Sequence, residues 1–360
     1  MKLDFCEVFD DYTSRCRKIP KEEYLSNGKY IVIDQGQNNI AGYTNIDDGL
    51  FEDVPAIVFG DHTRIIKYVD EPFFLGADGV KLLKSKIKDA NYKYLYYALR
   101  NAKIPDTGYN RHFKWLKEIN LEYKDAESQK NIVKTLDTVT NIIELYKVEL
   151  SKLDNLIRAR FVEMFGDLKN IIRLGDCCEV HARIGWQALT RNEHMKTGEY
   201  MLVTGIDFID GKVNFDTCVY VTKERYEMDH HIILKNNDIL ITKDGSIGKV
   251  AIVKNLPKPA TLNSGIFVVR PNETFNKEYI SSVFRGPLFE KFVEVSKTGA
   301  TIKHLNQKHL VEFGIPVPTI EEQKVFAEFS EQVNKSKVEV KRALDEAQLL
   351  FDSLMQKYFG

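Results

Sequence analysis

Two stretches of this chain repeat each other, and both lack the residues that interrupt helices. Leu116–Gly166 aligns with Leu310–Gly360 residue for residue without a gap, and both copies end in Phe-Gly. None of the ten prolines lies in 124–170 or 319–360, and the only glycines within the repeat's helical part are the terminal Gly166 and Gly360. Because a helix interior tolerates proline and glycine least, the repeat predicts two long helices. Each would contain about 38 residues and extend roughly 57 Å at 1.5 Å per residue.

Apolar residues in both segments follow a heptad pattern. The first seam consists of Ile132, Leu136, Val139, Ile143, Tyr146, Leu150, Leu153 and Ile157. The second keeps the same register through Phe326, Ser330, Val333, Lys337, Val340, Leu344, Ala347, Phe351, Leu354 and Tyr358. A narrow seam of this period packs against a partner helix, so we expect the two helices to form an antiparallel coiled coil. Two explanations of the interruption at Lys337 stay open: a side chain that snorkels at the edge, or a polar residue that fixes register.

The rest of the chain forms two blocks, and each block precedes one long helix. Both contain short β-rich apolar runs separated by Asp-Gly and Asn/Asp-rich turns, which is typical of strands joined by tight loops. Short helices are expected at 91–101 and 277–293. We therefore predict an α+β protein in which two α/β blocks are each followed by a long helix, with pseudo-twofold symmetry. The expected segments are 1–123, 124–166, 167–318 and 319–360.

Composition excludes several classes of protein. The 360 residues contain 51 Lys and Arg against 52 Asp and Glu, a formal net charge of -1, so the chain is no polycation that binds nucleic acid through bulk charge. The five cysteines form no C-x-x-C pair, which argues against a zinc knuckle or a disulfide framework. No apolar run reaches the roughly 20 residues of a membrane span, and the first residues lack the apolar core of a signal peptide. We expect a soluble, cytoplasmic protein.

A glycine-containing turn in the second block carries candidate DNA contacts. Lys243–Lys249 resembles a phosphate loop, but Gly245 and Gly248 enclose only two residues and Val250 stands where Ser or Thr is required, so an ATP site is rejected. A tight hairpin turn is the simpler interpretation. Such a turn also presents Lys243, Ser246 and Lys249 to a DNA phosphate or groove edge.

Polar residues also gather after an apolar run of the first block. Asp61-His-Thr-Arg64 follows Gly60, and no G-x-S-x-G motif supports a hydrolase there. The segment is either a turn that hydrogen-bonds its own backbone or a DNA contact made by His62 and Arg64. An amide cluster lies at Gln35, Gln37, Asn38 and Asn39. Asn and Gln bind adenine in the major groove, although they are also ordinary loop residues.

Matching donor-rich segments precede the two copies of the repeat. Gly108–Lys114 offers Asn110, Arg111, His112 and Lys114, and 299–307 offers Lys303, His304 and Gln307. A protein with two DNA-recognition parts would present such a pair of segments. The histidines lack the spacing of metal ligands, so neither a metal nor a cofactor is expected.

Taken together, these motifs resemble the specificity subunit of a type I restriction-modification enzyme, over nearly the whole chain. The stretches that carry the resemblance are Phe59–Arg64, Gly76–Lys81, Arg183–Trp186, Asp238–Lys249, Leu262–Gly265 and Ile315–Gln323. Ile315–Gln323 matches the segment that leads into the family's long helix, whereas Leu121–Gln129 is a degenerate copy without the prolines. The first block is also shorter than the second, which leaves its number of strands open.

The resemblance implies a function. The two blocks would be target recognition domains that bind double-stranded DNA, one half-site of an asymmetric bipartite target each, and the helices would be the spacer. Two methyltransferase (modification) subunits and the restriction/translocase subunits would be its partners. The chain lacks a Pro-Pro-Tyr methylation motif and a glycine-rich dinucleotide loop, so we expect a non-catalytic subunit. The alternative is a coiled-coil interaction scaffold without sequence-specific DNA binding.

The candidate DNA-binding residues combine the polar turns with the two segments before the helices. They are Arg64, Asn110, Arg111, His112, Lys114, Lys243, Ser246, Lys249, Lys303, His304 and Gln307.

Overall fold

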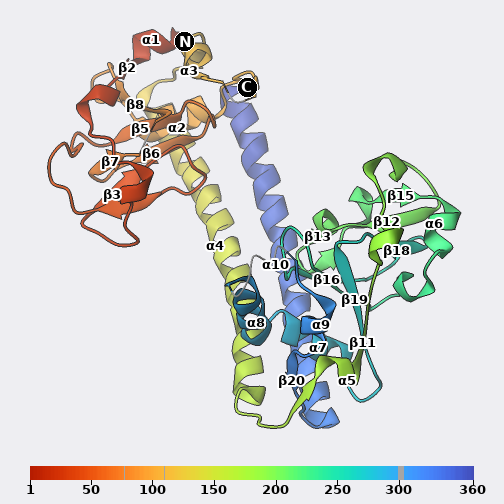
Figure 1. Ribbon diagram of the computed structural model, residues 1–360. Coiled ribbons are helices and arrows are strands. Elements are labelled where there is room, and N and C mark those ends of the chain that lie inside the picture. The colour runs from red at the N-terminus through yellow and green to blue at the C-terminus, as the bar shows by residue number, and fades with distance from the viewer. Residues whose placement is uncertain (77, 109, 299–303) are drawn as a thin grey trace. The chain divides into compact units, whose positions relative to one another are not determined.

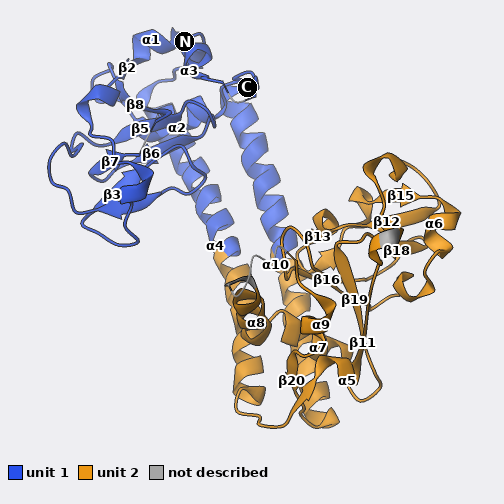
Figure 2. Cartoon of the chain, in the orientation of Figure 1, with its two compact units in different colours: residues 1–147, 341–360 blue, residues 148–340 orange. Residues whose placement is uncertain are grey.

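The computed structural model describes residues 1–76, 78–108, 110–298 and 304–360, without the side chains of 186, 297 and 298 (Figure 1). Contacts divide the chain into two compact units (Figure 2). Unit 1 contains 1–147 and 341–360, and unit 2 contains 148–340. Both long helices thus contribute one part to each unit, whereas the four segments expected from the sequence end at the helix boundaries. That four-segment division stays a prediction, and we describe each unit by itself.

Unit 1 is built from two sheets and a small strand pair. Its strands are β1 (Lys2–Asp4), β2 (Phe9–Asp11), β3 (Tyr30–Ile33), β4 (Gly42–Thr44), β5 (Ala56–Gly60), β6 (Ile66–Val69), β7 (Phe73–Leu75), β8 (Val80–Ser85) and β9 (Asn120–Glu122). Its short helices are α1 (Phe5–Val8), α2 (Tyr92–Arg100) and α3 (Phe113–Leu116). An antiparallel sheet has the order β2-β8-β5-β6, a mixed sheet has the order β4-β3-β7, and β1 pairs with β9.

Strand β5 shows how the core of unit 1 forms. Side chains alternate between the faces of a strand, so Ile57 and Phe59 join one cluster with α2 and the long helices. Ala56 and Val58 point the other way, into a cluster that includes Ile31 of β3. All five residues of β5 are buried, which is why its sequence is a continuous apolar run and not an alternating one.

Unit 2 repeats this plan with additional elements. Its strands are β10 (Ile171–Arg173), β11 (Cys178–Ala182), β12 (Tyr200–Val203), β13 (Phe208–Ile209), β14 (Lys212–Val213), β15 (Val219–Val221), β16 (Ile239–Thr242), β17 (Val250–Ile252), β18 (Ala260–Leu262), β19 (Ile266–Pro271) and β20 (Gly314–Pro316). Its short helices are α5 (Leu174–Cys177), α6 (Lys223–Glu227), α7 (Lys277–Phe284), α8 (Pro287–Thr298) and α9 (Gln307–Leu310). The sheets are β11-β19-β16-β17-β14-β13, β15-β12-β18 and β10-β20.

The repeat seen in the helices extends through both blocks. β3 runs parallel to β7 as β12 does to β18, β5 pairs with β8 as β16 does with β19, and β1 pairs with β9 as β10 does with β20. The second block adds the β13–β14 hairpin, α6 and α8, which accounts for its greater length. The expected α+β class with a duplicated block and long helix is confirmed.

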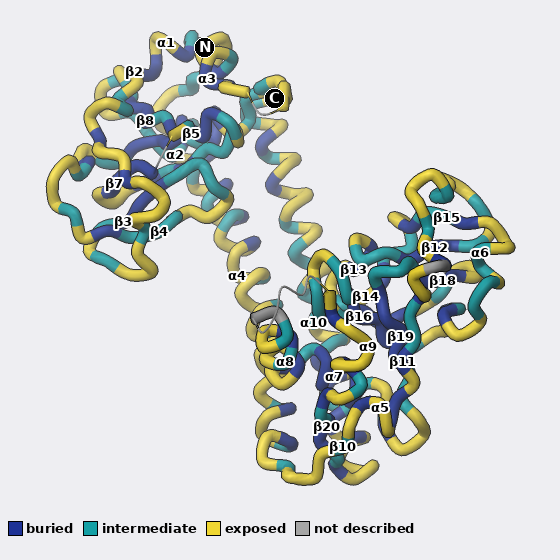
Figure 3. Tube along the Cα trace, in the orientation of Figure 1, coloured by how far each residue is buried: buried dark blue, intermediate teal, exposed yellow. Residues whose placement is uncertain are grey.

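The long helices α4 (Ala126–Phe165) and α10 (Ile320–Phe359) contain 40 residues each, slightly more than expected. In unit 1 the start of α4 packs against the end of α10, with Ile132, Leu136, Phe351 and Met355 in one cluster. In unit 2 the end of α4 packs against the start of α10, so the helices are antiparallel as predicted. Figure 3 shows that buried positions lie toward both ends of each helix. Ile132, Leu136, Val139 and Ile143 of α4 and Phe326, Ser330, Val333 and Phe351 of α10 are buried seam positions, whereas the central seam positions are half-buried.

The two polar seam residues of α10 have specific partners. Ser330 is fully buried, and its hydroxyl donates to Oε1 of Glu278 in α7 at 3.1 Å. The ammonium of Lys337 pairs with the Asp154 carboxylate on α4. Of these two contacts, only that of Lys337 joins the two long helices, and its partner Asp154 is largely exposed, so it is compatible with both explanations of the interruption.

Within the described ranges, none of the helices combines the length and apolarity needed to cross a membrane.

Candidate nucleic-acid interface

Several strands of unit 1 end at one edge of the fold, where the polar segments meet. The backbone N–H of Gly76, after β7, donates to the Ile33 carbonyl at the end of β3 (2.7 Å). The N–H of Asp61, after β5, donates to the Gly79 carbonyl just before β8 (2.7 Å). We call the segments 34–41, 61–64, 76–79 and 106–114 the loop edge of unit 1; residues 77 and 109 lie outside the described residues.

Asp61 connects the turn 61–64 to the segment 106–114. Its side chain is buried, and Oδ1 accepts from the backbone N–H of Phe113 at 2.7 Å. Its carbonyl accepts from the N–H of His112 at 2.8 Å. Thr63 donates its hydroxyl to the Gln35 carbonyl at 2.7 Å. Oγ1 of Thr63 also accepts from the N–H of Ile65 at 3.4 Å, so the turn bonds partly to its own backbone, as one of the two sequence interpretations supposed, and partly to other segments.

His112 is fully buried, which corrects its prediction as a DNA contact. Its Nδ1 lies 3.0 Å from the Asp61 carbonyl oxygen, and its ring packs near Trp115. The repeat gives the reason, because the N–H of Leu305 bonds to the Lys243 carbonyl as that of His112 does to Asp61. Leu305 is also buried. The position belongs to the core in both units. The sequence did not indicate this, because histidine is a polar residue type and lies in a donor-rich segment.

The other candidates of unit 1 lie on the loop edge. Arg64 adopts φ 61°, and its guanidinium pairs with Asp106 at 2.7 Å. Asn110, Arg111 and Lys114 are exposed. The carbonyl of Asn110 lies 3.2 Å from Nδ1 of His62, so the turn 61–64 and the segment 106–114 form one surface.

The amide cluster divides into supporting and exposed residues. Gln35 accepts from the N–H of His62 through Oε1 and donates through Nε2 to the Asp78 carbonyl, both at 3.2 Å. Lys67 is buried and donates to the Asn38 carbonyl at 2.6 Å; burial lowers the pKa of its ammonium. The side chains available to a ligand are therefore the exposed Gln37, Asn38 and Asn39.

Unit 2 builds the same edge with equivalent hydrogen bonds. The N–H of Asn263 donates to Val203, that of Lys243 donates to Gly265, and that of Leu305 donates to Lys243, each at 2.9 Å. The ends of β12, β16 and β18 thereby meet the start of β19. We call 183–187, 204–207, 243–249, 263–265 and 304–307 the loop edge of unit 2.

The turn 243–249 is the tight turn that the sequence indicated. Thr242 is buried; its Oγ1 accepts from the N–H of Lys249 and its carbonyl from that of Gly248, both at 2.9 Å. Gly245 and Gly248 have φ values of 66° and 85°, which side chains other than glycine rarely adopt. The turn leaves Ser246 and Lys249 exposed. In the part of the chain that the structure describes, Lys249 makes no ion pair.

The remaining candidates of unit 2 lie beside this turn. Lys243 is partly buried, with Nζ 5.5 Å from the centre of the Phe267 ring. His304 is exposed and hydrogen-bonds the Asp244 carboxylate. Gln307 donates its amide to the Val180 carbonyl at 2.8 Å, which indicates a positioning role for that group. Lys303 lies outside the described residues.

Sequence reasoning missed two exposed isoleucines on the loop edge of unit 2. Ile184 is 55% exposed and Ile206 is 83% exposed. Arg183, beside Ile184, donates from Nε to the Leu262 carbonyl at 2.8 Å, which places it at this edge. A search for donors and charges passes over such residues. One signal in the sequence could have indicated the exposure of Ile206. The residue lies between Gly205 and Asp207 in a turn, where an aliphatic side chain is not packed into a core.

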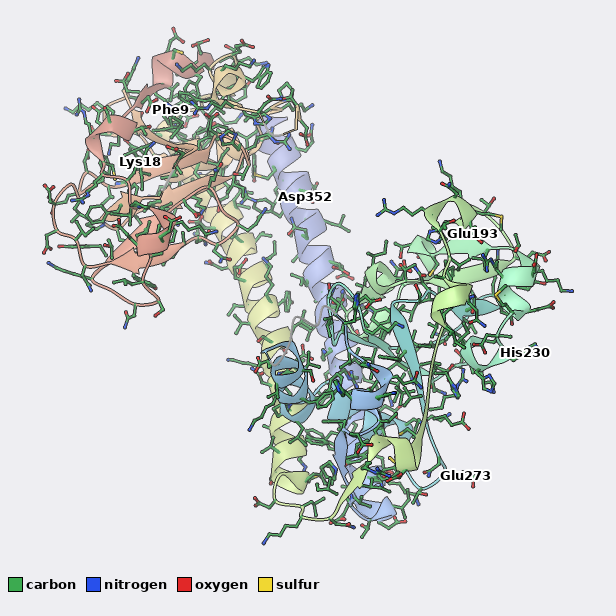
Figure 4. The ribbon with its side chains drawn as sticks, viewed as in Figure 1. Phe9, Lys18, Glu193, His230, Glu273 and Asp352 are labelled. Carbon is green, nitrogen blue, oxygen red and sulfur yellow. The ribbon has the colours of Figure 1, made fainter. Side chains whose placement is uncertain are left out.

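The described residues contain no group of three or more His, Cys, Asp or Glu side chains that could hold a metal ion. Each unit instead has a polar loop edge. Its exposed cations, amides and hydroxyls lie on segments that buried hydrogen bonds hold in place. Figure 4 shows the side chains of both units. Such groups bind phosphates and base edges.

The chain belongs to a known family of DNA specificity proteins. Residues 3–155 and 167–347 match the model of the type I restriction modification DNA specificity domain. The resemblance that the motifs carried is thereby confirmed, and the family is that of type I restriction-modification specificity subunits.

Curated relatives agree with this assignment. The EcoR124I/EcoR124II specificity subunit of Escherichia coli is 24% identical over 328 residues, covering 86% of this chain and 80% of that protein. The putative MjaX specificity subunit of Methanocaldococcus jannaschii is 24% identical over 364 residues, covering 90% and 81%.

Solved structures share the fold. The S subunit of a type I restriction-modification system from M. genitalium matches with a TM-score of 0.54 at 18% identity, covering 100% of this chain and 96% of that chain. A chain from a structural study of complex assembly in the type I R-M system matches with a TM-score of 0.52 at 14% identity, covering 98% and 97%.

Proposed function

We propose that this chain binds an asymmetric, bipartite duplex target and that each loop edge contacts one half-site. The observation that carries the proposal is the pair of loop edges themselves. Equivalent backbone hydrogen bonds build both edges, yet the side chains on them differ. A duplicated scaffold with two different surfaces would recognise two different short sequences.

The exposed residues suit a division between positioning and recognition. Lysines and arginines at the edges would contact phosphates, which set position and not sequence. We assign Arg64, Arg111, Lys114, Lys243 and Lys249 to that group, and Lys303 by its sequence alone. Asn110, Ser246 and His304 would contact base edges, where amides and hydroxyls distinguish base pairs. Gln307 would hold its segment in place.

The low net charge is consistent with such selectivity. Nonspecific affinity grows with the number of neutralised phosphates, and this chain carries a formal net charge of -1. A few placed cations beside amides would favour one sequence over random DNA, with further affinity supplied by partner subunits.

The proposal includes the partners and the absence of catalysis. We infer that two methyltransferase subunits and the restriction/translocase subunits assemble on this chain and that the chemistry resides in them. Two findings support this: the relatives are named as specificity subunits, and one matching chain comes from a type I R-M system studied for its complex assembly. Methyl transfer to DNA by the purified chain alone would contradict the non-catalytic part.

Salt-dependent binding tests the DNA-binding part. Gel-shift titrations with the methyltransferase partner present, at several salt concentrations, give the slope of log affinity against log salt. Lys249→Ala should weaken binding to all duplexes alike and reduce the slope by about one. Lys335→Ala is the matched control, because Lys335 is an exposed lysine on α10 paired with Glu331 and away from the loop edges.

Two results would count against the proposal. An unchanged slope for Lys249→Ala would remove that residue from the interface. Absence of salt-sensitive binding by the wild-type complex would reject DNA recognition and favour the interaction scaffold.

A further inference from the structure

Ile206 is an exposed aliphatic side chain at a place where the proposed function puts DNA. Among the large hydrophobic residues in the described part of the chain it is the most exposed, at 83%. It lies in the single 3₁₀ turn η5 (Gly205–Asp207) that follows β12. A Cβ at Gly205 would lie 3.1 Å from Cγ2 of Thr242, the residue that anchors the turn 243–249. Ile206 therefore adjoins the candidate recognition turn.

The turn that presents Ile206 is held rigidly. Asp207 is buried; it accepts from the N–H and hydroxyl of Thr204 at 2.8 and 2.9 Å and from the Thr217 hydroxyl at 2.7 Å. Its carbonyl also accepts from the N–H of Asn214 at 2.8 Å. The backbone that carries Ile206 thus has a fixed position before any ligand binds, which reduces the entropy lost on binding.

The equivalent segment of unit 1 has different chemistry. The residues after β3 end in the exposed amides Gln37, Asn38 and Asn39. Amides suit the hydrogen-bonding edge of adenine, whereas an apolar group in the major groove is complementary to the 5-methyl group of thymine. The two edges therefore differ in the kind of base feature that they can recognise.

We propose that Ile206 contacts the 5-methyl group of a thymine in the half-site bound by unit 2 and so contributes to base specificity. This inference rests on the proposed function. It adds that Ile206 is the residue of unit 2 that selects a base and that the thymine methyl group is what it recognises. Ile206 makes no hydrogen bond with its side chain, so its contribution is burial of apolar surface in the complex.

A protein-and-DNA double substitution isolates this contact. The target is first selected from random duplexes with the full chain and its methyltransferase partner. Each thymine of that target is then replaced by uracil, which lacks only the methyl group. At one position the wild-type protein should bind the uracil duplex about fourfold more weakly than the thymine duplex, the value expected for one buried methyl or methylene group. Ile206→Ala should bind the thymine and uracil duplexes at that position equally.

Two further variants control for structure. Ile171→Ala changes an isoleucine of comparable type, 52% exposed in β10, away from the loop edge, and should keep the wild-type response to uracil. Ile206→Val keeps a branched side chain and should restore part of the response.

The outcomes separate the inference from the proposed function. If the wild-type complex binds its target but Ile206→Ala responds to every uracil as the wild type does, the thymine contact is wrong and DNA recognition stands. If no thymine position responds in the wild type, the contact is also wrong. Failure of the wild type to select any sequence would overturn both.

Discussion

At the residue scale, buried polar groups decide what the loop edges present. Asp61 and Gln35 have residue types that suit DNA contact, yet the side chains of both bind backbone partners. Sequence alone cannot separate the two uses, because they need the same hydrogen-bonding groups. The exposed Arg111 and Lys249, in contrast, were predictable from donor-rich segments that precede or connect regular elements.

Removal of the Asp61 acceptor should destabilise the fold. Asp61→Ala leaves the buried N–H of Phe113 without its partner, which costs about 1–3 kcal/mol of unfolding free energy. Asp61→Asn retains an acceptor oxygen in the same place and should cost less. Urea unfolding of both variants checks this, and equal losses would show that the hydrogen bond to Phe113 is not the cause.

Glu193 should make the stability of unit 2 sensitive to acid. Hydrogen bonds from the Thr190 N–H, then the Arg225 guanidinium and the Thr190 hydroxyl, lower the pKa of Glu193 to about 2 from its ordinary 4.5 (Figure 4 labels Glu193). A carboxyl whose pKa is depressed on folding stabilises the protein above the unfolded value and loses that contribution as pH falls to the folded value. The stability difference between wild type and Glu193→Gln should therefore shrink from pH 5 to pH 2 in urea unfolding. A difference that stays constant over this range would contradict the assignment.

At the element scale, the long helices were the most predictable feature. Their seam follows a simple period, and the absence of proline and glycine marks their extent. The sheet order was not predictable, because pairings such as β3 with β7 join segments that are distant in sequence and separated by other strands. The buried Ser330 could not be explained either, because its partner Glu278 lies on α7.

The seam gives a matched pair of substitutions on one helix. Leu136 on α4 is fully buried in the core cluster of unit 1, so Leu136→Ala should lower the unfolding free energy by about 2–5 kcal/mol. Leu145 on the same helix is 67% exposed, and Leu145→Ala should change it by no more than about 0.5 kcal/mol. Urea unfolding monitored by circular dichroism measures both. Comparable losses would contradict the assigned helix face.

At the scale of the whole molecule, duplication gives one chain two loop edges with different side chains, which the proposed recognition of two sequences requires. The ungapped repeat predicted two copies of block and helix, and the structure extends the match to the strands and their hydrogen bonds. The second block also contains insertions such as the β13–β14 hairpin. Insertions have no counterpart in the other copy, so the repeat carries no information about them.

Separate recognition by the two edges is the central claim, and selection of bound duplexes tests it most directly. Random duplexes are selected with the wild-type chain, with Asn110→Ala and with Ser246→Ala, each with the methyltransferase partner. The wild type should select two defined blocks separated by unspecified base pairs. Asn110→Ala should relax base preference in one block only, and Ser246→Ala in the other only. A single continuous motif, or both variants relaxing the same block, would contradict the account.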